Sequence, residues 1–192
     1  MMGFQKDSYY INKVLAGDLS AYSSLVEKHK GMVYTVALRM VKNPQDAEEI
    51  TQDAFLKAFR SLKSFKGKSK FSTWIYKIIY NTAVSRLRKK QIETIKIDNE
   101  NPGNFDCEQT SNELKKLCDE DRKKYVRAAF EKLPEEDEII LTLYYLNESS
   151  VEEICEIIKL TKSNVKVKLH RARKKFYLAL EHLLKEELTS IL

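Results

Sequence analysis

Glycine, proline and cysteine are all scarce in this sequence, whose 192 residues include 5 glycines, 3 prolines and 3 cysteines. So little glycine and proline excludes collagen-like and low-complexity chains, and it leaves few of the turns that β-hairpins need. The three cysteines and three histidines are widely spaced. A disulfide framework or a zinc site needs such residues in pairs at short spacing, so neither a metal nor another cofactor is expected.

Long apolar runs are missing as well. No stretch of about 18 consecutive apolar residues occurs, so the sequence predicts no membrane insertion. Residues 1–10 lack the basic start and apolar run of a signal peptide, so the expected location is cytoplasmic. Hydrophobic residues make up 43% of the chain, too many for a chain that is disordered throughout. The length suits one domain or two small ones.

Charge is distributed in blocks, although the net charge is only +6. Residues 57–90 contain 11 basic residues and no acidic one, and residues 162–175 contain 7 basic residues and no acidic one. Between these blocks, residues 98–121 contain 8 acidic and 2 basic residues. Solvated surfaces usually mix the two signs, so two blocks without acids indicate two surfaces that meet the same polyanion.

The acidic stretch also divides the chain. Residues 91–112 lack strong apolar periodicity and include Pro102, Gly103 and several asparagines, a composition typical of a flexible linker. Helical periodicity is strong on both sides, and strand signals are weak. The sequence therefore predicts an all-α protein with two small helical modules, residues 1–92 and 113–192, joined by a flexible acidic linker of residues 93–112. It leaves the relative placement of the modules open.

In the first module, Asn43 and Pro44 predict a helix start, with an asparagine cap followed by proline where its missing N–H is not needed. Asp46 and Glu49 then place negative charge in the first turns. Such a face repels nucleic acid and attracts a basic protein surface, although compensation of the helix dipole is a simpler explanation. The apolar residues of this helix are expected to form one buried stripe: Ala47, Ile50, Ala54, Phe59 and Leu62.

Aromatic residues are interleaved with lysines and arginines in residues 57–90. Basic side chains follow a sugar–phosphate backbone, and exposed rings stack on unpaired bases, so this block suits single-stranded or opening DNA better than intact duplex. Core burial is the alternative, above all for Trp74 and Tyr80. Burial of both Phe65 and Phe71, in a stretch rich in lysine and serine, is less expected.

The second module carries a helix-turn-helix pattern. A short helix at about 151–158 and a three-residue break precede a longer basic helix that Thr161 is placed to cap. The opposite face of that helix is basic and can enter the major groove of DNA. A basic helix solvated on the surface of a bundle is the alternative. The buried side of the helix is expected to comprise Val165, Leu169, Ala172 and Phe176.

Motifs of catalysis are absent. The sequence has no phosphate-binding glycine loop, no zinc-protease motif and no glycine-flanked nucleophile, so we expect no enzyme activity. Two other classes remain as alternatives. A stand-alone helix-turn-helix regulator would bind duplex DNA as a dimer, but it has no need for the basic aromatic block. A nucleic-acid-processing enzyme would need the motifs that are missing.

Four motifs resemble one family. Asn43-Pro-Gln-Asp-Ala-Glu-Glu-Ile and Phe65-Lys-Gly-Lys-Ser-Lys-Phe-Ser-Thr-Trp are similar to region two of extracytoplasmic-function sigma factors of bacterial RNA polymerase. Leu133-Pro-Glu-Glu and Val165-Lys-Val-Lys-Leu-His-Arg-Ala-Arg are similar to their region four. The resemblance covers residues 21–90 and 130–176, in the order of the family.

The resemblance implies a promoter-specific sigma subunit that binds core RNA polymerase, recognises and opens the minus-ten element, and reads the minus-thirty-five element. Residues 1–92 correspond to region two and residues 113–192 to region four. The implied partners are the clamp helices of the largest polymerase subunit, the flap of the second-largest subunit, promoter DNA and an anti-sigma factor. The acidic linker corresponds to the segment that is threaded toward the RNA exit path.

The resemblance also assigns three sets of residues. The set for core polymerase is Asp46, Glu49, Gln52, Asp53, Leu56 and Lys57. The set for single-stranded minus-ten DNA is Phe65, Lys66, Gly67, Lys68, Ser69, Phe71, Ser72, Trp74, Lys77 and Asn81. The set for minus-thirty-five duplex DNA is Lys162, Asn164, Lys166, Val167, Lys168, His170, Arg171 and Arg173.

The sequence departs from the family at three positions. Lys159 stands in the turn where the family usually has glycine, so we expect a strained or altered turn. Val167 stands where serine or threonine is common, so a methyl contact replaces a hydrogen bond. Cys155 stands where alanine is frequent, which agrees with a small buried residue.

Overall fold

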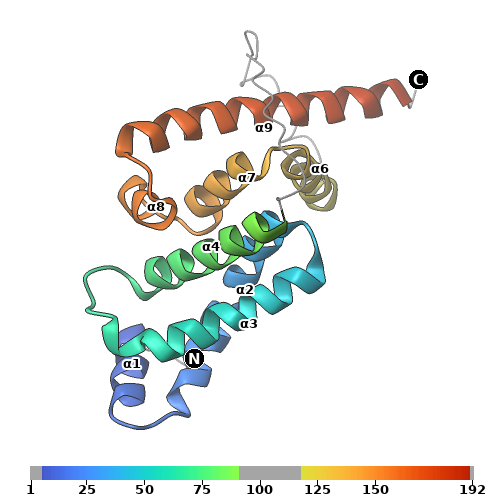
Figure 1. Cartoon of the computed structure of the whole chain (residues 1–192). Helices are drawn as coiled ribbons and strands as arrows, with labels where there is room; N and C mark the ends of the chain where they lie inside the picture. Colours follow the sequence, from blue (N-terminus) through green and yellow to red (C-terminus); the bar gives the residue numbers. More distant parts are fainter. Residues whose placement is uncertain (1–5, 91–117, 191–192) are drawn as a thin grey trace.

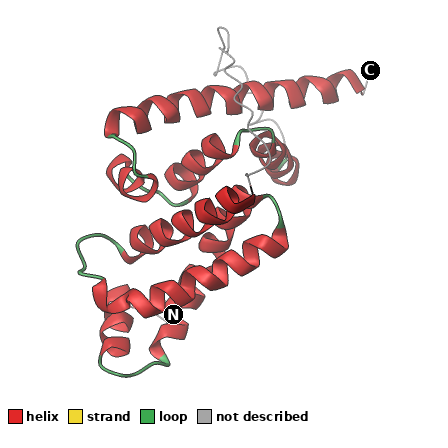
Figure 2. Ribbon diagram, viewed as in Figure 1, coloured by secondary structure: helices red, strands yellow, loops and turns green. Residues whose placement is uncertain are grey.

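The computed structural model describes residues 6–90 and 118–190, and all regular structure in these two ranges is helical (Figures 1 and 2). The N-terminal module contains α1 (Asp7–Leu15), α2 (Ala21–Val41), α3 (Pro44–Ser61), the short η1 (Leu62–Ser64) and α4 (Phe71–Lys90). The C-terminal module contains α6 (Asp119–Glu131), α7 (Glu135–Leu141), η3 (Thr142–Leu146), α8 (Val151–Ile158) and α9 (Lys162–Ser190). The all-α prediction is confirmed, and the predicted linker lies outside the described residues.

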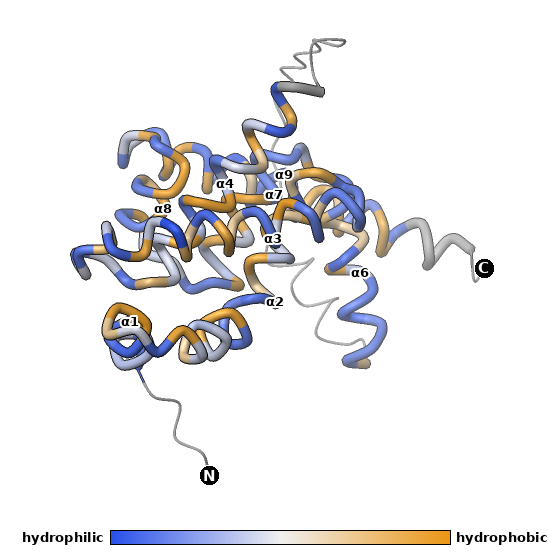
Figure 3. The backbone as a smooth tube through the Cα atoms, turned by 60° about the horizontal axis from the view of Figure 1, so that its bottom comes forward, coloured by the Kyte–Doolittle hydropathy of each residue, from blue (hydrophilic) through white to orange (hydrophobic). Residues whose placement is uncertain are grey.

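Helices α2, α3 and α4 pack against one another, and α1 packs on α2. Apolar positions recur along each labelled helix between hydrophilic ones (Figure 3), which is the pattern that lets a helix bury one face. The core side chains of this module are fully buried: Leu25, Val33, Met40, Ile50, Ile75 and Ile79. None of the described helices is long and apolar enough to cross a membrane.

The expected stripe of α3 is correct except at Phe59. Ala47, Ile50 and Ala54 are buried, but the next apolar positions in the core are Phe55 and Ala58, while Phe59 is 37% exposed. A helix turns 100° per residue, so position 58 continues the row from 54, and position 59 is turned toward solvent. The exposed ring of Phe59 lines a groove between α2 and α3.

In the C-terminal module, the first half of α9 packs on α7 and α8, and α6 packs on α9 as well. The contact with α6 forms a small separate cluster from Tyr125, Ala129, Leu180 and Leu184. The predicted buried face of α9 is confirmed for Val165, Leu169 and Ala172, whereas Phe176 is half-buried against Phe130.

The two modules contact each other. Helix α4 packs against α8, and α2 packs against α7, so the C-terminal module covers one side of the N-terminal module (Figure 1). The main cluster of buried residues is continuous across this boundary, and it includes Ile75 and Ile79 of α4 together with Ile154 and Ile157 of α8. The placement that the sequence leaves open is therefore a packed, apolar interface in this structure.

Candidate polymerase and nucleic-acid interfaces

The acidic face predicted on α3 exists and begins with the predicted cap. The side chain of Asn43 accepts a hydrogen bond from the backbone N–H of Asp46 at 2.9 Å, and Pro44 occupies the first turn. Because the opposite side of α3 is buried, the residues expected to bind polymerase face outward. Asp46 is half-buried and the rest are exposed: Glu49, Gln52, Asp53, Leu56 and Lys57.

Two ion pairs join this face to α4. Arg86 donates to Glu49 Oε2 at 2.6 Å and to Asp46 Oδ1 at 3.4 Å. These contacts, the hydrogen bond to Glu49 first, raise the pKa of the Arg86 guanidinium. Lys57 Nζ donates to Thr82 Oγ1 at 3.2 Å. The face is therefore less negative than α3 alone suggests, and part of it is already engaged within the module.

An apolar groove of about 650 Å³ lies beside the acidic face, between α2 and α3. Leu56 is 53% exposed at its rim, and the rings of Phe59 and Tyr22 meet edge to face, with centroids 4.9 Å apart. The hydroxyl of Tyr22 donates to the carbonyl oxygen of Phe55 at 2.7 Å, and burial raises its pKa to about 12. The sequence analysis missed this groove. The available signal was the position of Phe59, one residue off the buried row.

Three aromatic rings gather where the predicted minus-ten loop meets α4. The centroids of Phe65 and Trp74 lie 5.2 Å apart, and Phe71 lies 5.8 Å from Phe65 and 5.6 Å from Trp74. Phe65 and Trp74 are half-buried, whereas Phe71 is only 3% exposed and packs 5.3 Å from the ring of His29. The ring of Phe71 therefore lies in the core beneath the other two, and its contact with DNA stays a prediction.

The remaining minus-ten residues lie around these rings. Lys66, Gly67 and Lys68 are exposed, and Gly67 has a φ of +66°, a conformation that favours glycine. Ser69 and Ser72 are half-buried. On the adjoining flank of α4, Lys77 is exposed, while Trp74 and Asn81 are half-buried. Residues 74, 77 and 81 follow one another at helical spacing, so α4 places them on one side.

The helix-turn-helix has the predicted bounds. Ser150 and Glu153 form a capping box at the start of α8, in which each side chain accepts a hydrogen bond from the other residue's backbone N–H, at 3.1 and 2.8 Å. Thr161 Oγ1 accepts from the backbone N–H of Asn164 at 3.3 Å and caps α9. Between the helices, Lys159 has a φ of +58°, the left-handed conformation that explains glycine at this position in the family.

Most residues predicted to read duplex DNA are exposed on α9. The exposed fraction of Val167 is 45%. The exposed residues of the set are Lys162, Asn164, Lys166, Val167, His170 and Arg171. Three predicted residues have partners within the chain. Lys162 pairs with Glu152, Lys168 pairs with Glu136, and the guanidinium of Arg173 lies 5.2 Å from the ring centroid of Tyr144.

Arg173 is half-buried, unlike the six exposed residues of the predicted set. Its guanidinium also lies 5.5 Å from the ring of Tyr145. A cation placed over two rings is held against η3 and does not project into a groove. The sequence pattern put Arg173 on the exposed face because it treats α9 as an isolated helix, without the tyrosines of η3.

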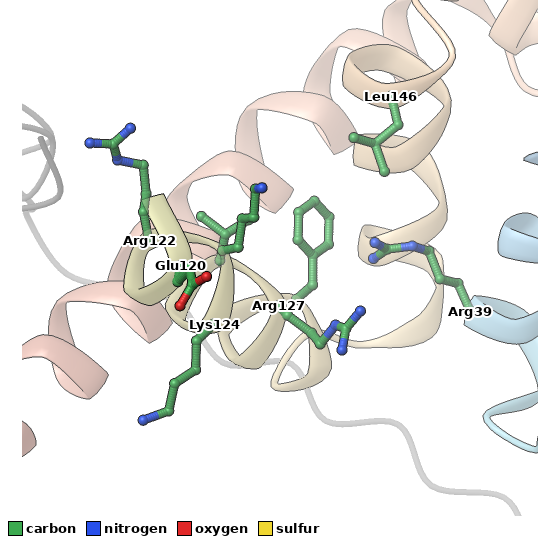
Figure 4. A pocket seen from close by; sticks show the side chains of 9 residues that line it. Arg39, Glu120, Arg122, Lys124, Arg127 and Leu146 are labelled. Atoms are coloured by element: carbon green, nitrogen blue, oxygen red, sulfur yellow. The ribbon is translucent and has the colours of Figure 1, made fainter. Parts of the chain in front are cut away.

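A further basic groove of about 810 Å³ lies between α2 and α6. Figure 4 shows Arg39 reaching from α2 toward the helix that carries Arg127, with Leu146 above the space between them. The guanidinium of Arg39 lies 4.3 Å from the ring centroid of Phe130, which forms part of the lining. The sequence analysis did not single out these residues, because they come from different modules.

Two carboxylates join the modules, a buried one on α7 and a half-buried one on α8. Glu138 of α7 is 3% exposed and accepts a hydrogen bond from Arg39 Nη1 at 2.8 Å, and Lys42 pairs with the same carboxylate. Glu153 of α8 accepts from Lys70 and from Thr73, each at 3.1 Å. Burial alone would raise the pKa of Glu153, but hydrogen bonds from the Ser150 N–H, Lys70 and Thr73 outweigh it and lower the pKa. Glu153 is therefore ionised at neutral pH.

Comparisons with known proteins match each module to a region of one family. The family model described as Sigma-70 region 2 matches residues 25–92, and the model described as Sigma-70, region 4 matches residues 123–176. The chain is 32% identical over 170 residues to the ECF RNA polymerase sigma factor SigW of Bacillus subtilis, covering 85% of this chain and 90% of that protein. It is 31% identical over 174 residues to the ECF RNA polymerase sigma-E factor of Escherichia coli K12, covering 87% and 90%.

Solved structures share the fold. The sigma factor RpoE in complex with the anti-sigma factor NepR, from Bartonella quintana, superposes with a TM-score of 0.63 at 18% identity, covering 83% of this chain and 96% of that chain. CnrH in complex with the cytosolic domain of CnrY superposes with a TM-score of 0.58 at 18% identity, covering 93% and 99%.

The helix-turn-helix, the basic aromatic flank of α4 and the order of the two modules define a DNA-binding initiation factor of transcription. The chain belongs to the extracytoplasmic-function group of the sigma-70 family of RNA polymerase sigma factors. Its class of function is therefore promoter-specific initiation of transcription.

Proposed function

We propose that residues 1–92 bind core RNA polymerase and open the minus-ten element, that residues 113–192 read the minus-thirty-five element, and that residues 93–112 connect them. The observation that carries this proposal is that the two basic surfaces differ in the side chains that accompany their cations. The phenyl and indole rings of Phe65 and Trp74 accompany the lysines at the start of α4, whereas the exposed set on α9 consists of cations, an amide, a valine and the imidazole of His170. Rings suit unpaired bases, and a basic helix suits the major groove.

The exposed face of α3 is the surface for the clamp helices of the largest polymerase subunit. Glu49, Gln52, Asp53 and Leu56 are exposed together on it, with the apolar groove alongside. Such a combination of carboxylates and an exposed leucine suits a basic, amphipathic helical partner, because charge orients the encounter and the apolar contact holds it. The flap of the second-largest subunit is assigned to the C-terminal module.

At the minus-ten element, Phe65 and Trp74 supply the rings for an unpaired base, with Lys66, Lys68 and Lys77 placed for the phosphates. Stacking on such rings contributes roughly 1–3 kcal/mol per base, which offsets the few kcal/mol needed to extrude a base from duplex. Phe71 supports the other two rings from within the core. Its role is to position them.

At the minus-thirty-five element, Lys166, Val167, His170 and Arg171 are the residues that face base edges. All four are exposed near the N-terminal end of α9. Arginine and lysine donate to guanine acceptors, and the valine methyl groups contact a thymine methyl. Lys162 and Asn164 contact phosphates and set the register of the helix.

An anti-sigma factor is a further proposed partner. The RpoE structure with a similar fold contains one, but that similarity concerns only the fold. We also propose that the chain catalyses nothing itself and acts with polymerase in the cytoplasm. Its contribution to initiation is then recognition and opening of the promoter.

The test is capture of the purified chain by core polymerase, followed by run-off transcription on genomic fragments. We expect a stable complex and new start sites, and Asp53→Arg should weaken capture strongly, because it reverses an exposed charge on the α3 face. Glu156→Arg, an equal charge reversal on the exposed side of α8, is the matched control and should capture normally. A chain that ignores polymerase and binds duplex DNA as a dimer would favour the stand-alone regulator instead.

A further inference from the structure

The basic groove between α2 and α6 contains none of the residues proposed to bind polymerase or DNA. Its lining combines five cations and one acid with three apolar side chains: Arg39, Arg122, Lys123, Lys124, Arg127, Glu120, Val126, Phe130 and Leu146. Its volume of about 810 Å³ lies in the range of small-molecule sites, roughly 300–1,000 Å³, and such sites often form where domains meet. Cations beside apolar side chains suit an anion that also carries an apolar group.

Two guanidiniums form the charged centre of the groove. Arg39 of α2 and Arg127 of α6 reach into the same space, and in the same view Arg122 and Lys124 point away from it (Figure 4). Burial lowers the pKa of Arg39, and the positive charge of Arg127 lowers it further, although Glu131 acts in the opposite direction. Arg127 is exposed and has no ion pair with any other described residue. An anion bound between the two guanidiniums therefore relieves their repulsion.

The guanidinium of Arg39 is held in place before any ligand arrives. It lies 4.3 Å from the ring centroid of Phe130, and its Nη1 donates to Glu138 at 2.8 Å. A guanidinium carries several N–H donors in a planar fork, so one hydrogen bond to Glu138 leaves most of them for another acceptor. Binding to a side chain that is already ordered costs less entropy than binding to a mobile one.

The apolar part of the lining indicates more than an inorganic anion. Leu146, at the end of η3, is 46% exposed and lies above the space between the two guanidiniums (Figure 4). Val126 is half-buried on the α6 side of the groove. A free phosphate gains nothing from these side chains. A nucleotide has a base with an apolar face that can pack on them, while its phosphates accept hydrogen bonds from the cations.

We propose that the groove between α2 and α6 binds a nucleoside polyphosphate, with its phosphates between Arg39 and Arg127 and its base on Val126 and Leu146. The two guanidiniums come from different modules, so the bound nucleotide bridges them. This site is separate from the surfaces proposed for polymerase and promoter DNA, and it does not depend on their assignment.

The test is calorimetric titration of the full chain with ATP, with inorganic tripolyphosphate and with adenosine, at one salt concentration. Arg127→Gln removes the exposed guanidinium. Lys132→Gln is the matched control, because Lys132 is an exposed cation at the end of the same helix and does not line the groove. Arg39→Lys keeps a positive charge beside Glu138 but loses the planar fork.

We expect Arg127→Gln to weaken ATP binding about five- to ten-fold, because a charge-assisted hydrogen bond to phosphate is lost. Lys132→Gln should change the affinity by less than about two-fold. Arg39→Lys should also weaken ATP binding while the urea midpoint of unfolding stays the same. No measurable binding of ATP, or equal effects of Arg127→Gln and Lys132→Gln, would overturn the proposed site.

A further variant tests the base contact. Leu146→Ala should weaken ATP binding about two- to three-fold and leave the affinity for tripolyphosphate unchanged, because only the nucleotide has a base to pack. Equal affinities for ATP and tripolyphosphate, both indifferent to Leu146→Ala, would reduce the groove to general attraction of anions and overturn its assignment to a nucleotide.

Nucleic acid is the competing ligand, because it carries the same phosphates. Each protein is therefore also titrated with fluorescein-labelled single-stranded DNA of random sequence. We expect Arg127→Gln and Lys132→Gln to bind this strand equally. If Arg127→Gln weakens the binding of the strand as much as that of ATP, the groove belongs to the nucleic-acid surface and the proposal is wrong.

Discussion

The Arg39 guanidinium and the Glu138 carboxylate meet at 2.8 Å across the boundary between the modules, although 99 residues separate them in the sequence. The side chain of Glu138 is 4% exposed and that of Arg39 is 19% exposed, and Lys42 pairs with the same carboxylate. A carboxylate this deeply buried is tolerated only with partners, so the pair specifies how α7 sits on α2 more than it adds stability.

Removal of one partner of this pair should therefore destabilise the chain. We expect Arg39→Ala to lower the free energy of unfolding by about 3 kcal/mol, because it leaves a buried carboxylate short of a partner. Urea unfolding measures this change. The double variant Arg39→Met with Glu138→Leu should recover most of the loss, since it removes both charges. The pair has no such role if the losses of Arg39→Met alone and Glu138→Leu alone simply add in the double variant.

The left-handed residue at the turn gives a second prediction. Lys159 has a φ of +58° and is exposed, so Lys159→Gly should stabilise the chain by about 1 kcal/mol through relief of the strain between Cβ and the backbone. Lys159→Ala keeps the Cβ atom and should differ from the unaltered chain by less than about 0.5 kcal/mol. Thermal and urea unfolding of the unaltered chain, Lys159→Gly and Lys159→Ala measure these differences in stability. A glycine variant no more stable than the alanine variant would contradict strain at this turn.

The buried imidazole of His29, which packs against Phe71, should make the stability of the chain depend on pH. Burial lowers the pKa of His29 below its ordinary 6.5, although Asp7, 3.3 Å from Nε2, acts in the opposite direction. As the pH falls, His29 of the unfolded chain takes up a proton before His29 of the folded chain does. The contribution of neutral His29 to the free energy of unfolding is therefore fully present above about pH 6.5 and decreases below it. We expect His29→Gln to flatten this part of the pH profile of urea midpoints. An unchanged slope between about pH 7.5 and pH 5.5 would show that His29 titrates as it does in the unfolded chain.

The half-buried rings of Phe65 and Trp74 give a prediction about promoter opening. Phe65→Ala together with Trp74→Ala should impair opening, measured by permanganate reactivity of unpaired thymines, more than binding to duplex promoter DNA. The reason is that these rings contact bases only after the strands separate. Tyr9→Ala, which removes an exposed ring from α1, is the control and should affect neither assay. Equal losses in both assays, or no loss in either, would count against base capture.

The exposed end of α9 gives a prediction about sequence preference. Lys166→Ala and Arg171→Ala should change the sequences recovered by selection from random duplexes, because both side chains are proposed to face base edges. Lys162→Ala should weaken binding across all sequences and lower its salt dependence, since Lys162 is proposed to contact phosphate, which carries no sequence information. A changed preference for Lys162→Ala, or an unchanged one for the other two, would reverse these roles.

Local signals account for what could be predicted from the sequence. The start of α3, the bounds of α8 and the cap of α9 depend on residues within one or two turns, and all three predictions are confirmed. Predictions that depended on neighbours from elsewhere in the chain were less accurate. Phe71 is buried partly against His29 of α2, a neighbour that the local sequence does not indicate. Phe59 is exposed for a local reason, because it lies one residue off the buried row of α3.

The acids of α7 illustrate the same limit. A run of acidic residues at a helix start is explained locally by the helix dipole, and that explanation suffices for Glu135, which is exposed. Asp137 and Glu138 are instead buried and pair with Lys175 and Arg39, which lie 38 and 99 residues away. No spacing rule in the sequence indicates such partners, and the contact of Glu153 with Lys70 was missed for the same reason.

Helix α9 continues far past the part that reads DNA. Its 29 residues span about 43 Å, and its distal half is anchored on α6 through Leu180 and Leu184, while its reading residues lie at the opposite end. The helix is thus held at both ends, on α7 and α8 beside the proposed reading residues and on α6 at the far end. Because the two contacts share one continuous helix, substitutions in α6 that repack Leu180 or Leu184 should still affect how firmly the far end of the proposed DNA-binding helix is held.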